Sequence, residues 1–233
     1  MISENFIAPR TLSVVIPTWN EELALPETIR HLRANPEVKE IIVADGGSRD
    51  LTCKVAAQLG CHVIASTPGR GTQMRAGAIG ASGDAILLLH ADTWMPPHAA
   101  RAALDCLGDP AVAGGGYWKK FRDPPLLLRG SKWKCAVRLH VCRRIAGDQG
   151  IFMRREVLQH IGGVPDVPLM EEFELCKRLR RVGRLVLADA VVLTSPRRFI
   201  ERGVLRTYAR MWRVMLQYYL GASPAELRRV YER

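Results

Sequence analysis

Two acidic positions in the 233-residue chain have surroundings that suit catalysis. Asp92 ends the tripeptide His-Ala-Asp at 90–92, which follows the apolar run 85–89. Burying a carboxylate at the end of such a run is costly unless the charge is paired or binds a metal. Mg²⁺ and Mn²⁺ are held by one or two carboxylates together with phosphate oxygens and water. Asp92 therefore indicates a site for a cation-bound diphosphate, with a helix cap before the segment at 96–97 as the alternative.

The second acidic position is the pair Glu171–Glu172, which begins an expected helix. On that helix Glu172 shares a face with the apolar residues Leu175 and Leu179, at i+3 and i+7. This phase predicts that Glu172 points inward and that Glu171 lies on the solvated side. A helix N-terminus favours an ionised carboxylate, which a general base requires. The alternative is a pair of acids that only satisfies free backbone N–H groups at the helix start.

Two further segments place short polar residues directly after apolar runs. Residues 13–22 read SVVIPTWNEE, and residues 45–50 read DGGSRD. Polar groups at such strand ends can hold a nucleobase and a ribose, and Asp45 can accept a hydrogen bond from the imide N–H of uracil. Ordinary turns followed by helix caps use the same residue types. The residues alone leave both interpretations open.

A glycine-rich segment at 69–77 reads GRGTQMRAG and resembles a phosphate cradle. It matches neither GxGxxG nor GxxxxGK[ST], so a nucleoside-triphosphate loop is not expected. Arg70 and Arg75 can still oppose the charge of a diphosphate. The alternative is a glycine-tolerant helix that packs tightly on a sheet.

Alternating strands and helices must position these residues. The first half predicts strands at 12–16, 41–44, 62–65 and 85–89, with helices between them, one of them at about 72–81. This order predicts an α/β fold with a mostly parallel central sheet and helices on both faces. Ligands bind such sheets at the carboxyl ends of the strands, which is where Pro17, Asn20, Asp45 and Asp92 fall.

The second half of the chain is less regular. A strand that begins at 114–118 is expected at the edge of the sheet, and a basic helix is expected over 126–145. Further strands are expected at 150–153 and 191–193. Residues 204–220 predict an amphipathic helix rich in arginine and aromatic residues, which suits an anionic membrane surface. Packing on the domain or on a second subunit is the alternative.

Composition limits the class of protein. A hydrophobic content of 48% supports a single domain over 1–233, with a first half at about 11–110, a second half at 111–200 and a helical segment at 201–233. The net charge of +11 favours anionic partners. The six cysteines form no CxxC pair, so we expect reduced thiols and no zinc site. No run approaches the ~18 apolar residues of a membrane span, and the acidic N-terminus is unlike a signal peptide. We expect a cytoplasmic protein, at most peripheral at the inner face of the membrane.

The motifs occur in the order that is typical of the family 2 glycosyltransferases. They are SVVIPTWNEE, DGGSRD, LLLHADT, GDQGIFMRREVL and the acid pair at 171–172. Over about residues 12–198 the chain resembles this family, especially its small stand-alone bacterial members. The resemblance implies the GT-A fold, with a nucleotide-binding first half and an acceptor-binding second half. It also implies an inverting, metal-assisted transfer of a sugar from a nucleotide-diphosphate donor, typically a UDP-sugar, to an acceptor hydroxyl.

The resemblance also assigns roles to residues. Glu171 and Glu172 match the catalytic acid pair, whose second member is the base, and His90 and Asp92 match the ends of the motif that binds Mn²⁺ or Mg²⁺. The positions that match the nucleotide-binding segments are Pro17, Thr18, Asn20, Glu21, Asp45, Arg70 and Gly71. Those that match the sugar or acceptor pocket are Asp148, Gln149 and Gly150, and Arg197 and Arg198 are candidates for binding the phosphates.

The chain departs from the family pattern at two places. His90 replaces the first acid of the DxD metal motif, and Glu172 stands where an aspartate is usual. The QxxRW signature of processive synthases is absent, and SPRRF occupies residues 195–199 in that region. We therefore expect transfer of a single sugar rather than synthesis of a polymer.

The expected partners are the nucleotide-sugar donor, a small-molecule or lipid-linked acceptor and a second copy of the chain in a homodimer. The sequence leaves peripheral membrane contact through the C-terminal helix open, beside packing of that helix on the domain or on a second subunit. Two other classes remain as alternatives. A sugar-phosphate nucleotidyltransferase would carry a glycine-rich basic loop after the first strand, where this chain has PTWNE at 17–21. A nucleic-acid-binding module would fit the charge, but the basic residues are scattered and no recognition motif appears, so we expect no nucleic acid.

Overall fold

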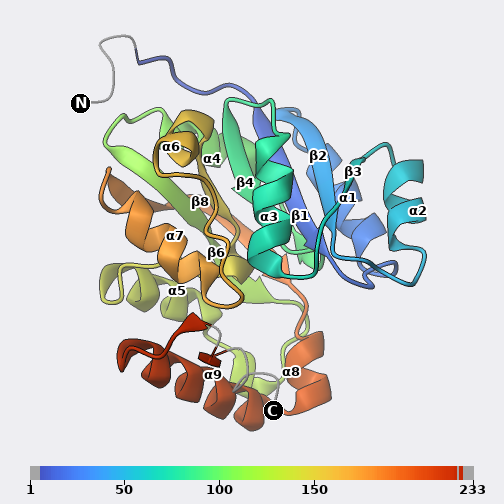
Figure 1. The fold of residues 1–233 in the computed structure, drawn as a ribbon. Coiled ribbons are helices and arrows are strands. Elements are labelled where there is room, and N and C mark those ends of the chain that lie inside the picture. Colours follow the sequence, from blue (N-terminus) through green and yellow to red (C-terminus); the bar gives the residue numbers. More distant parts are fainter. Residues whose placement is uncertain (1–5, 225, 228–233) are drawn as a thin grey trace.

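The computed structural model describes residues 6–224 and 226–227. Parts of the N-terminal and C-terminal segments considered above, residues 1–5, 225 and 228–233, lie outside this range. Figure 1 shows a central sheet with helices on both of its faces. The sheet has eight strands in the order β3-β2-β1-β4-β7-β6-β8-β5 in the described part of the chain. The strands are β1 (Leu12–Thr18), β2 (Val38–Asp45), β3 (His62–Ala65), β4 (Ala85–Leu88), β5 (Thr93–Trp94), β6 (Val112–Phe121), β7 (Ile151–Arg154) and β8 (Arg184–Thr194).

Most strands of the sheet run in one direction. β1 pairs in parallel with β2 and β4, and β2 pairs in parallel with β3. β7 is antiparallel to both β4 and β6, so β6 and its parallel neighbour β8 run with β4. Only β7 and the short β5 oppose the other described strands. The expected α/β fold with a mostly parallel sheet is confirmed.

The strand that begins near Gly114 was expected at the edge of the sheet, and this prediction is wrong. β6 is interior, between β7 and β8. Its glycines are required by close neighbours: a Cβ at Gly115 would lie 2.4 Å from the Phe152 ring, and one at Gly116 would lie 2.5 Å from Ile145. Glycine within a strand often marks a site where another group approaches the backbone closely.

Helices cover both faces of the sheet. They are α1 (Leu25–Arg33), α2 (Thr52–Gln58), α3 (Arg70–Ile79), α4 (Ala99–Leu107), α5 (Ser131–His140), α6 (Arg155–His160), α7 (Glu171–Leu179), α8 (Arg197–Arg202) and α9 (Val204–Tyr219), with 3-10 turns at Leu126–Leu128 and Gly147–Gln149. The single helix expected over 126–145 is wrong in extent. Gly130 and Arg143 have positive φ angles of 77° and 49°, which end a right-handed helix, so α5 lies between them.

Two hydrophobic cores lie on opposite faces of the sheet. Val14 and Ile16 of β1 pack in the core that contains α1 and α4. Val15, between them, packs in the core that contains α3, α6 and α7. This alternation follows from the two-residue period of a strand. The polar residues that follow the strands are therefore held at one edge of a rigid, two-sided core.

The C-terminal helices attach to the second half of the domain. A small cluster formed by Met170, Val214 and Leu227 joins α9 to the start of α7. The Phe199 ring of α8 contacts the rings of Phe121 and Tyr208. The helix expected over 204–220 is confirmed as α9. Among the described residues, no helix is long and apolar enough to cross a membrane.

Helix α3 approaches β1 closely enough to require a glycine. A Cβ at Gly77 would lie 2.4 Å from Cγ1 of Val15. Gly77 is buried on the same side of α3 as Met74. From Arg70 onward, the segment considered as a phosphate cradle is thus a helix, and at Gly77 it packs tightly on the sheet.

We predict that Gly77→Ala lowers the free energy of unfolding by about 1–3 kcal/mol, because the added methyl group overpacks the contact with Val15. Chemical denaturation in urea measures the change. Gly80→Ala is the matched control, since its Cβ would meet Ile64 at an ordinary 3.4 Å. Equal stabilities for the Gly77 variant and the wild type would contradict the close-packing argument.

Candidate active site

A hydrogen-bond network around Asp45 joins the carboxyl ends of β1 and β2. The Asp45 carboxylate accepts hydrogen bonds from the Thr18 hydroxyl at 3.0 Å and from the backbone N–H groups of Gly47 and Ser48, each at 2.8 Å. The Ser48 hydroxyl donates a further bond. Burial opposes ionisation of Asp45, but these donors outweigh it and lower its pKa. Because a carboxylate has about four acceptor positions, a nucleobase N–H would have to share or replace one of these donors.

Gln73 of α3 ties the same two strand ends together. Its side-chain amide donates to the carbonyl oxygens of Thr18 and Ala44, at 2.7 and 2.9 Å. Gln73 is buried and was not among the residues predicted from sequence. Its signal was its place three residues after Arg70 and four before Gly77, on the face of α3 that meets the sheet.

The other residues predicted for the nucleotide occupy the same edge. Pro17 pairs with Ala44 near the end of β1. Asn20, at a φ of 53°, donates its N–H to Ser48 Oγ and accepts the N–H of Arg49, both at 2.8 Å. Gly71 faces another part of the chain: a Cβ there would lie 2.8 Å from the carbonyl oxygen of Pro165, so the glycine permits the approach of the loop before α7.

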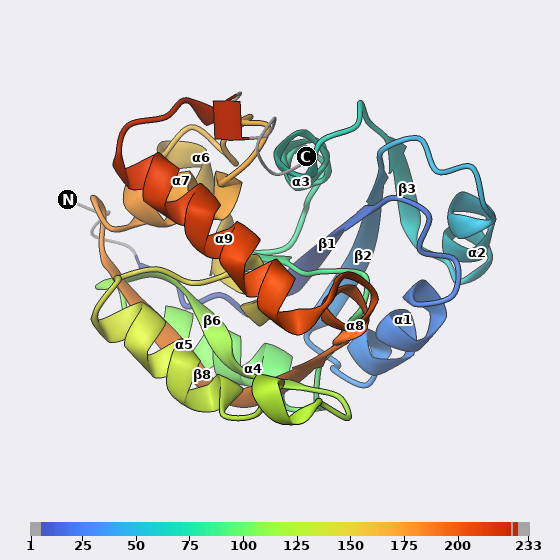
Figure 2. The ribbon, with the colours of Figure 1, turned by 90° about the horizontal axis from the view of Figure 1, so that it is seen from below.

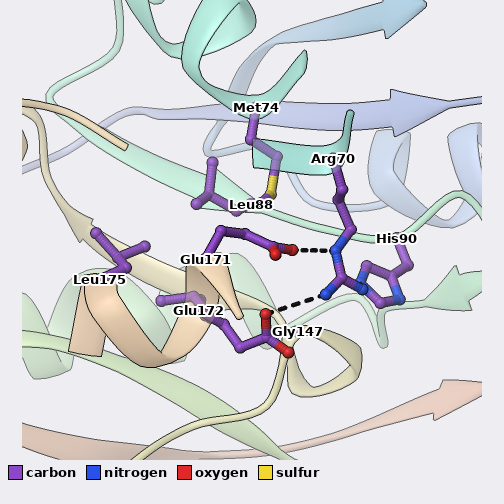
Figure 3. Close-up of a pocket in the computed structure, with 9 residues that line it drawn as sticks. Arg70, Met74, Leu88, His90, Gly147, Glu171, Glu172 and Leu175 are labelled. Atoms are coloured by element: carbon purple, nitrogen blue, oxygen red, sulfur yellow. Dashed lines mark hydrogen bonds and ion pairs between the residues drawn. The ribbon is translucent and has the colours of Figure 1, made fainter. Parts of the chain in front are cut away.

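Arg70 connects three parts of the site, as Figure 3 shows. Its guanidinium, from the first turn of α3, forms ion pairs with both glutamates at the start of α7. Nε donates to the Glu171 carboxylate, and Nη2 lies 3.0 Å from Oε2 of Glu172. Nη1 lies 3.4 Å from Nε2 of His90, just after β4. Both predicted catalytic residues and one predicted metal ligand therefore meet at a single cation.

The predicted orientation of the glutamate pair is wrong for Glu171. Its side chain is 2% exposed, whereas that of Glu172 is 14% exposed. Helical phase failed here because the partner that draws Glu171 inward, Arg70, belongs to another helix. The close approach at Gly71, whose Cβ would lie 3.3 Å from that of Glu171, brings α3 and α7 together. Both acids therefore point into the site.

The surroundings of this cluster alter its protonation. Burial, and then the charge of Glu171, raise the pKa of Glu172, although Arg70 acts in the opposite direction. Burial and the positive charge of Arg70 lower the pKa of His90 to about 4, so its imidazole is neutral at pH 7. The cavity that Arg70, His90 and the two glutamates line has a volume of about 10 Å³, which is room for roughly one water. Glu172 is therefore accessible only from its exposed side.

Asp92 lies apart from this cluster, close to the start of α8. Its carbonyl oxygen accepts the N–H of Ser195 at 3.3 Å, and the charges of Arg197 and Arg198 act on its carboxylate. Burial, and then the charge of Glu21, nevertheless raise the pKa of Asp92. Glu21 is held by Arg197 through two contacts of 3.1 and 2.9 Å.

The Asp92 carboxylate has the properties of a cation ligand. Its raised pKa marks a negative charge that lacks full compensation, and no described side chain or N–H group donates a hydrogen bond to it. The described residues contain no group of three or more His, Cys, Asp or Glu side chains that would hold a metal ion. An ion at Asp92 would therefore take its other ligands from a diphosphate and water, as Mg²⁺ commonly does.

The segment predicted for the sugar or acceptor is anchored by a second ion pair. Asp148 pairs with the buried Lys119 of β6, and Arg138 of α5 lies 3.9 Å away. Burial opposes ionisation of Asp148, but Lys119 and Arg138 outweigh it and hold its pKa well below its usual range. Gln149 accepts a bond from Arg138 at 2.8 Å and donates one to the carbonyl of Tyr117 at 3.1 Å.

This segment also adjoins the Arg70 cluster. A Cβ at Gly147 would lie 2.9 Å from Nε2 of His90, and Gly150 adopts a φ of 66°. Lys119 and Arg138 were not predicted from sequence. Nothing in the sequence near Lys119 indicates that it is buried, because its ion-pair partner, Asp148, lies 29 residues away.

We predict that Asp148→Asn lowers the free energy of unfolding by about 3 kcal/mol, because buried Lys119 loses a carboxylate. Asp105→Asn is the control: it removes an exposed pair with Arg101 and should cost less than about 1 kcal/mol. Urea denaturation measures both. Because the pKa of folded Asp148 is depressed, the stabilisation is present above about pH 4 and disappears as the pH falls further. Equal costs for the two variants would refute the assignment.

Comparison with known proteins places these residues in a family. Residues 13–161 match the profile described as Glycosyl transferase family 2. An undecaprenyl-phosphate 4-deoxy-4-formamido-L-arabinose transferase of Pseudomonas paraeruginosa is 36% identical over 98 residues, which are 37% of this chain and 29% of that protein. The enzyme of the same name from Sodalis glossinidius is 27% identical over 155 residues, 61% of this chain and 48% of that protein. The chain thus spans less than half the length of these relatives.

Solved structures share the fold. A mannosyltransferase from Pyrobaculum calidifontis aligns with a TM-score of 0.70 and 20% identity over 97% of this chain and 69% of that one. Glucosyl-3-phosphoglycerate synthase from Mycobacterium tuberculosis aligns with a TM-score of 0.58 and 23% identity over 80% and 70%. The architecture is therefore the GT-A fold. Since the family profile covers more than half of the chain, the protein belongs to glycosyl transferase family 2.

Proposed function

We propose that the chain transfers a single sugar from a nucleotide-diphosphate donor, a UDP-sugar, to an acceptor hydroxyl with inversion at the anomeric carbon. The observation that carries this proposal is the glutamate pair held by Arg70 beside the carboxyl end of β4, with Glu171 buried and Glu172 partly exposed. A family 2 chain needs a base at that edge of the sheet, and Glu172 is the member of the pair with access to solvent. An in-line displacement by a hydroxyl at one centre inverts that centre.

Glu172 has the protonation behaviour of a general base. Burial and the charge of Glu171 raise its pKa, which makes it a better proton acceptor than an ordinary carboxylate. Arg70 orients the carboxylate through the contact at 3.0 Å. Glu171 in turn fixes Arg70. Glu172 would take the proton from the acceptor hydroxyl, and Arg70 and Glu171 are positioning residues.

Mn²⁺ or Mg²⁺ would be held by Asp92 and would neutralise charge on the departing diphosphate. The mannosyltransferase above was solved with GDP-Man and Mn²⁺, and the synthase with UDP and Mn²⁺. The nucleotide would lie along the Thr18, Asn20 and Asp45 edge. Arg197, which pairs with Glu21, and its neighbour Arg198 would bind the phosphates. His90 was also predicted as a ligand, but its Nε2 faces the Arg70 guanidinium, so we assign the ion to Asp92.

A lipid-linked acceptor is supported by the names of the curated relatives, which are undecaprenyl-phosphate sugar transferases. A second candidate follows from those names: the acceptor group is a phosphate oxygen rather than a hydroxyl. A phosphate is already ionised at neutral pH and needs no base. The buried, proton-accepting Glu172 favours the hydroxyl.

We predict that Glu172→Gln lowers kcat by about 10²–10⁴-fold, because the amide cannot accept the proton. Glu172→Asp, which keeps the carboxylate, should retain more activity. Release of UDP with each candidate acceptor measures the rate. In the wild type, kcat/KM should fall as the pH decreases through the raised pKa of Glu172, since only the carboxylate is active. A wild-type rate for Glu172→Gln would exclude the base and favour a phosphate acceptor.

We predict that Asp92→Asn weakens UDP binding in the presence of Mn²⁺ by at least about tenfold, because the ion that joins protein and diphosphate loses its carboxylate. Calorimetric titration of UDP with and without Mn²⁺ measures this. Without the ion the two proteins should bind UDP alike. GDP serves as the control for the base. An unchanged Mn²⁺ effect in the variant would remove Asp92 from the metal site, and tighter binding of GDP would overturn the UDP assignment.

A further inference from the structure

Helix α9 carries a row of exposed apolar residues that we call the α9 stripe. Its members recur every three or four positions and so lie on one side of the helix. Leu205 is 71% exposed, Trp212 65%, Leu216 61% and Leu220, at the end of the helix, 77%. Exposed Ala209 completes the row. Contiguous exposed apolar surface of this kind marks a site of interaction.

The rest of the domain holds α9 by its opposite side. Val214, half a turn from the stripe, is buried against Met170 and Leu227. Lys134 of α5 donates to the Tyr208 hydroxyl at 2.9 Å. The stripe is therefore the outward side of a docked helix. The alternative considered from the sequence, packing of α9 on the domain, is present, and it leaves the apolar row uncovered by any described residue.

The charged residues of α9 itself are all arginines. Arg206 and Arg213 are exposed and lie one above the other along one edge of the stripe. Exposed Arg202 of α8 stands before them. No aspartate or glutamate occurs in α9, and the whole chain carries a net charge of +11. A second copy of α9 would bring these arginines against arginines, whereas an anionic surface would neutralise them.

Two elements next to α9 carry further exposed apolar residues. Figure 2 shows α9 running across this face of the molecule, with α8 at its beginning and α5 alongside. Ile200 of α8 is 61% exposed, and Trp133 of α5 is 70% exposed. Tryptophan is favoured at the boundary between lipid headgroups and acyl chains, because its ring is both apolar and polar.

The surface adjoins the candidate active site through α8. Arg197, the first residue of α8, pairs with Glu21 beside Asp92. Phe199, two residues later, contacts Tyr208 of α9. A bilayer on the α9 stripe would therefore lie next to the edge of the site where α8 begins.

We propose that the α9 stripe, with its flanking arginines, is a membrane-contact surface that lays α9 flat on an anionic bilayer. Trp212 and Leu216 would enter the boundary of headgroups and acyl chains, and Arg206 and Arg213 would contact lipid phosphates. This geometry presents the α8 side of the site to a lipid-linked acceptor, a consequence that rests on the proposed function. The membrane contact itself requires neither donor nor acceptor.

The test is flotation of the full chain with vesicles of equal parts phosphatidylglycerol and phosphatidylcholine. We expect binding that falls in about 0.5 M salt and is weak on phosphatidylcholine alone. The double variant Trp212→Glu/Leu216→Glu should bind at least about tenfold more weakly, and so should Arg206→Glu/Arg213→Glu. The controls are Ile79→Glu, at an apolar residue of α3 that is 78% exposed, and Lys54→Glu on α2, and both should bind like the wild type.

A second measurement tests whether Trp212 enters the bilayer and uses a variant that keeps the apolar surface. Brominated lipid should quench the tryptophan fluorescence of the wild type, and Trp212→Phe should keep binding but lose much of the quenching. Equal binding by wild type and both stripe variants would overturn the proposal. So would a concentration-dependent dimer in light scattering that the Trp212→Glu/Leu216→Glu variant abolishes, without vesicle binding. UDP calorimetry on the same proteins, without vesicles, tests the proposed function independently.

Discussion

The site depends on one charge balance, in which the Arg70 guanidinium compensates two carboxylates that are withdrawn from water. Each buried ion costs several kcal/mol of desolvation, and the attraction between them offsets this only in good geometry. Arg70 provides that geometry because its planar fork presents separate N–H groups to Glu171 and Glu172. The start of α7 can therefore approach the start of α3. Without the charge of Arg70, burial of Glu171 and Glu172 would oppose this approach.

Helix α3 positions the Arg70 guanidinium because residues on three successive turns, all on one side of the helix, make different contacts. Arg70 meets α7, Gln73 binds the ends of β1 and β2, and Gly77 allows the helix to touch Val15. Gly77 sets the distance between α3 and the sheet, and the hydrogen bonds of the Gln73 amide fix the rotation of α3 about its own axis. The cation is consequently positioned by the ends of β1 and β2, although the acids that it holds belong to the second half of the chain.

The parts of this arrangement that follow from local pattern were predictable from the sequence. Strand ends bearing Thr18, Asp45 and Asp92 follow from apolar runs that end in polar residues. The orientation of Glu171 was not predictable. Its partner Arg70 lies 101 residues away in the sequence and does not affect the spacing of apolar residues in α7, on which the prediction was based. Gly115 was misinterpreted for the same reason: glycine fits an edge strand or a crowded interior, and Phe152 decides between them. Buried Lys119 likewise depends on Asp148.

The presence of two glutamates, rather than one, gives the site a way to accept a proton without losing its structure. With both ionised, the two acids and Arg70 carry one net negative charge, and neutral His90 adds none. If Glu172 takes up a proton, Glu171 still neutralises Arg70, and the buried cluster becomes uncharged overall. A lone glutamate on Arg70 would instead leave a partly buried, uncompensated cation after proton uptake, which is the less stable state. The buried Glu171 therefore serves Glu172 by keeping the protonated state inexpensive.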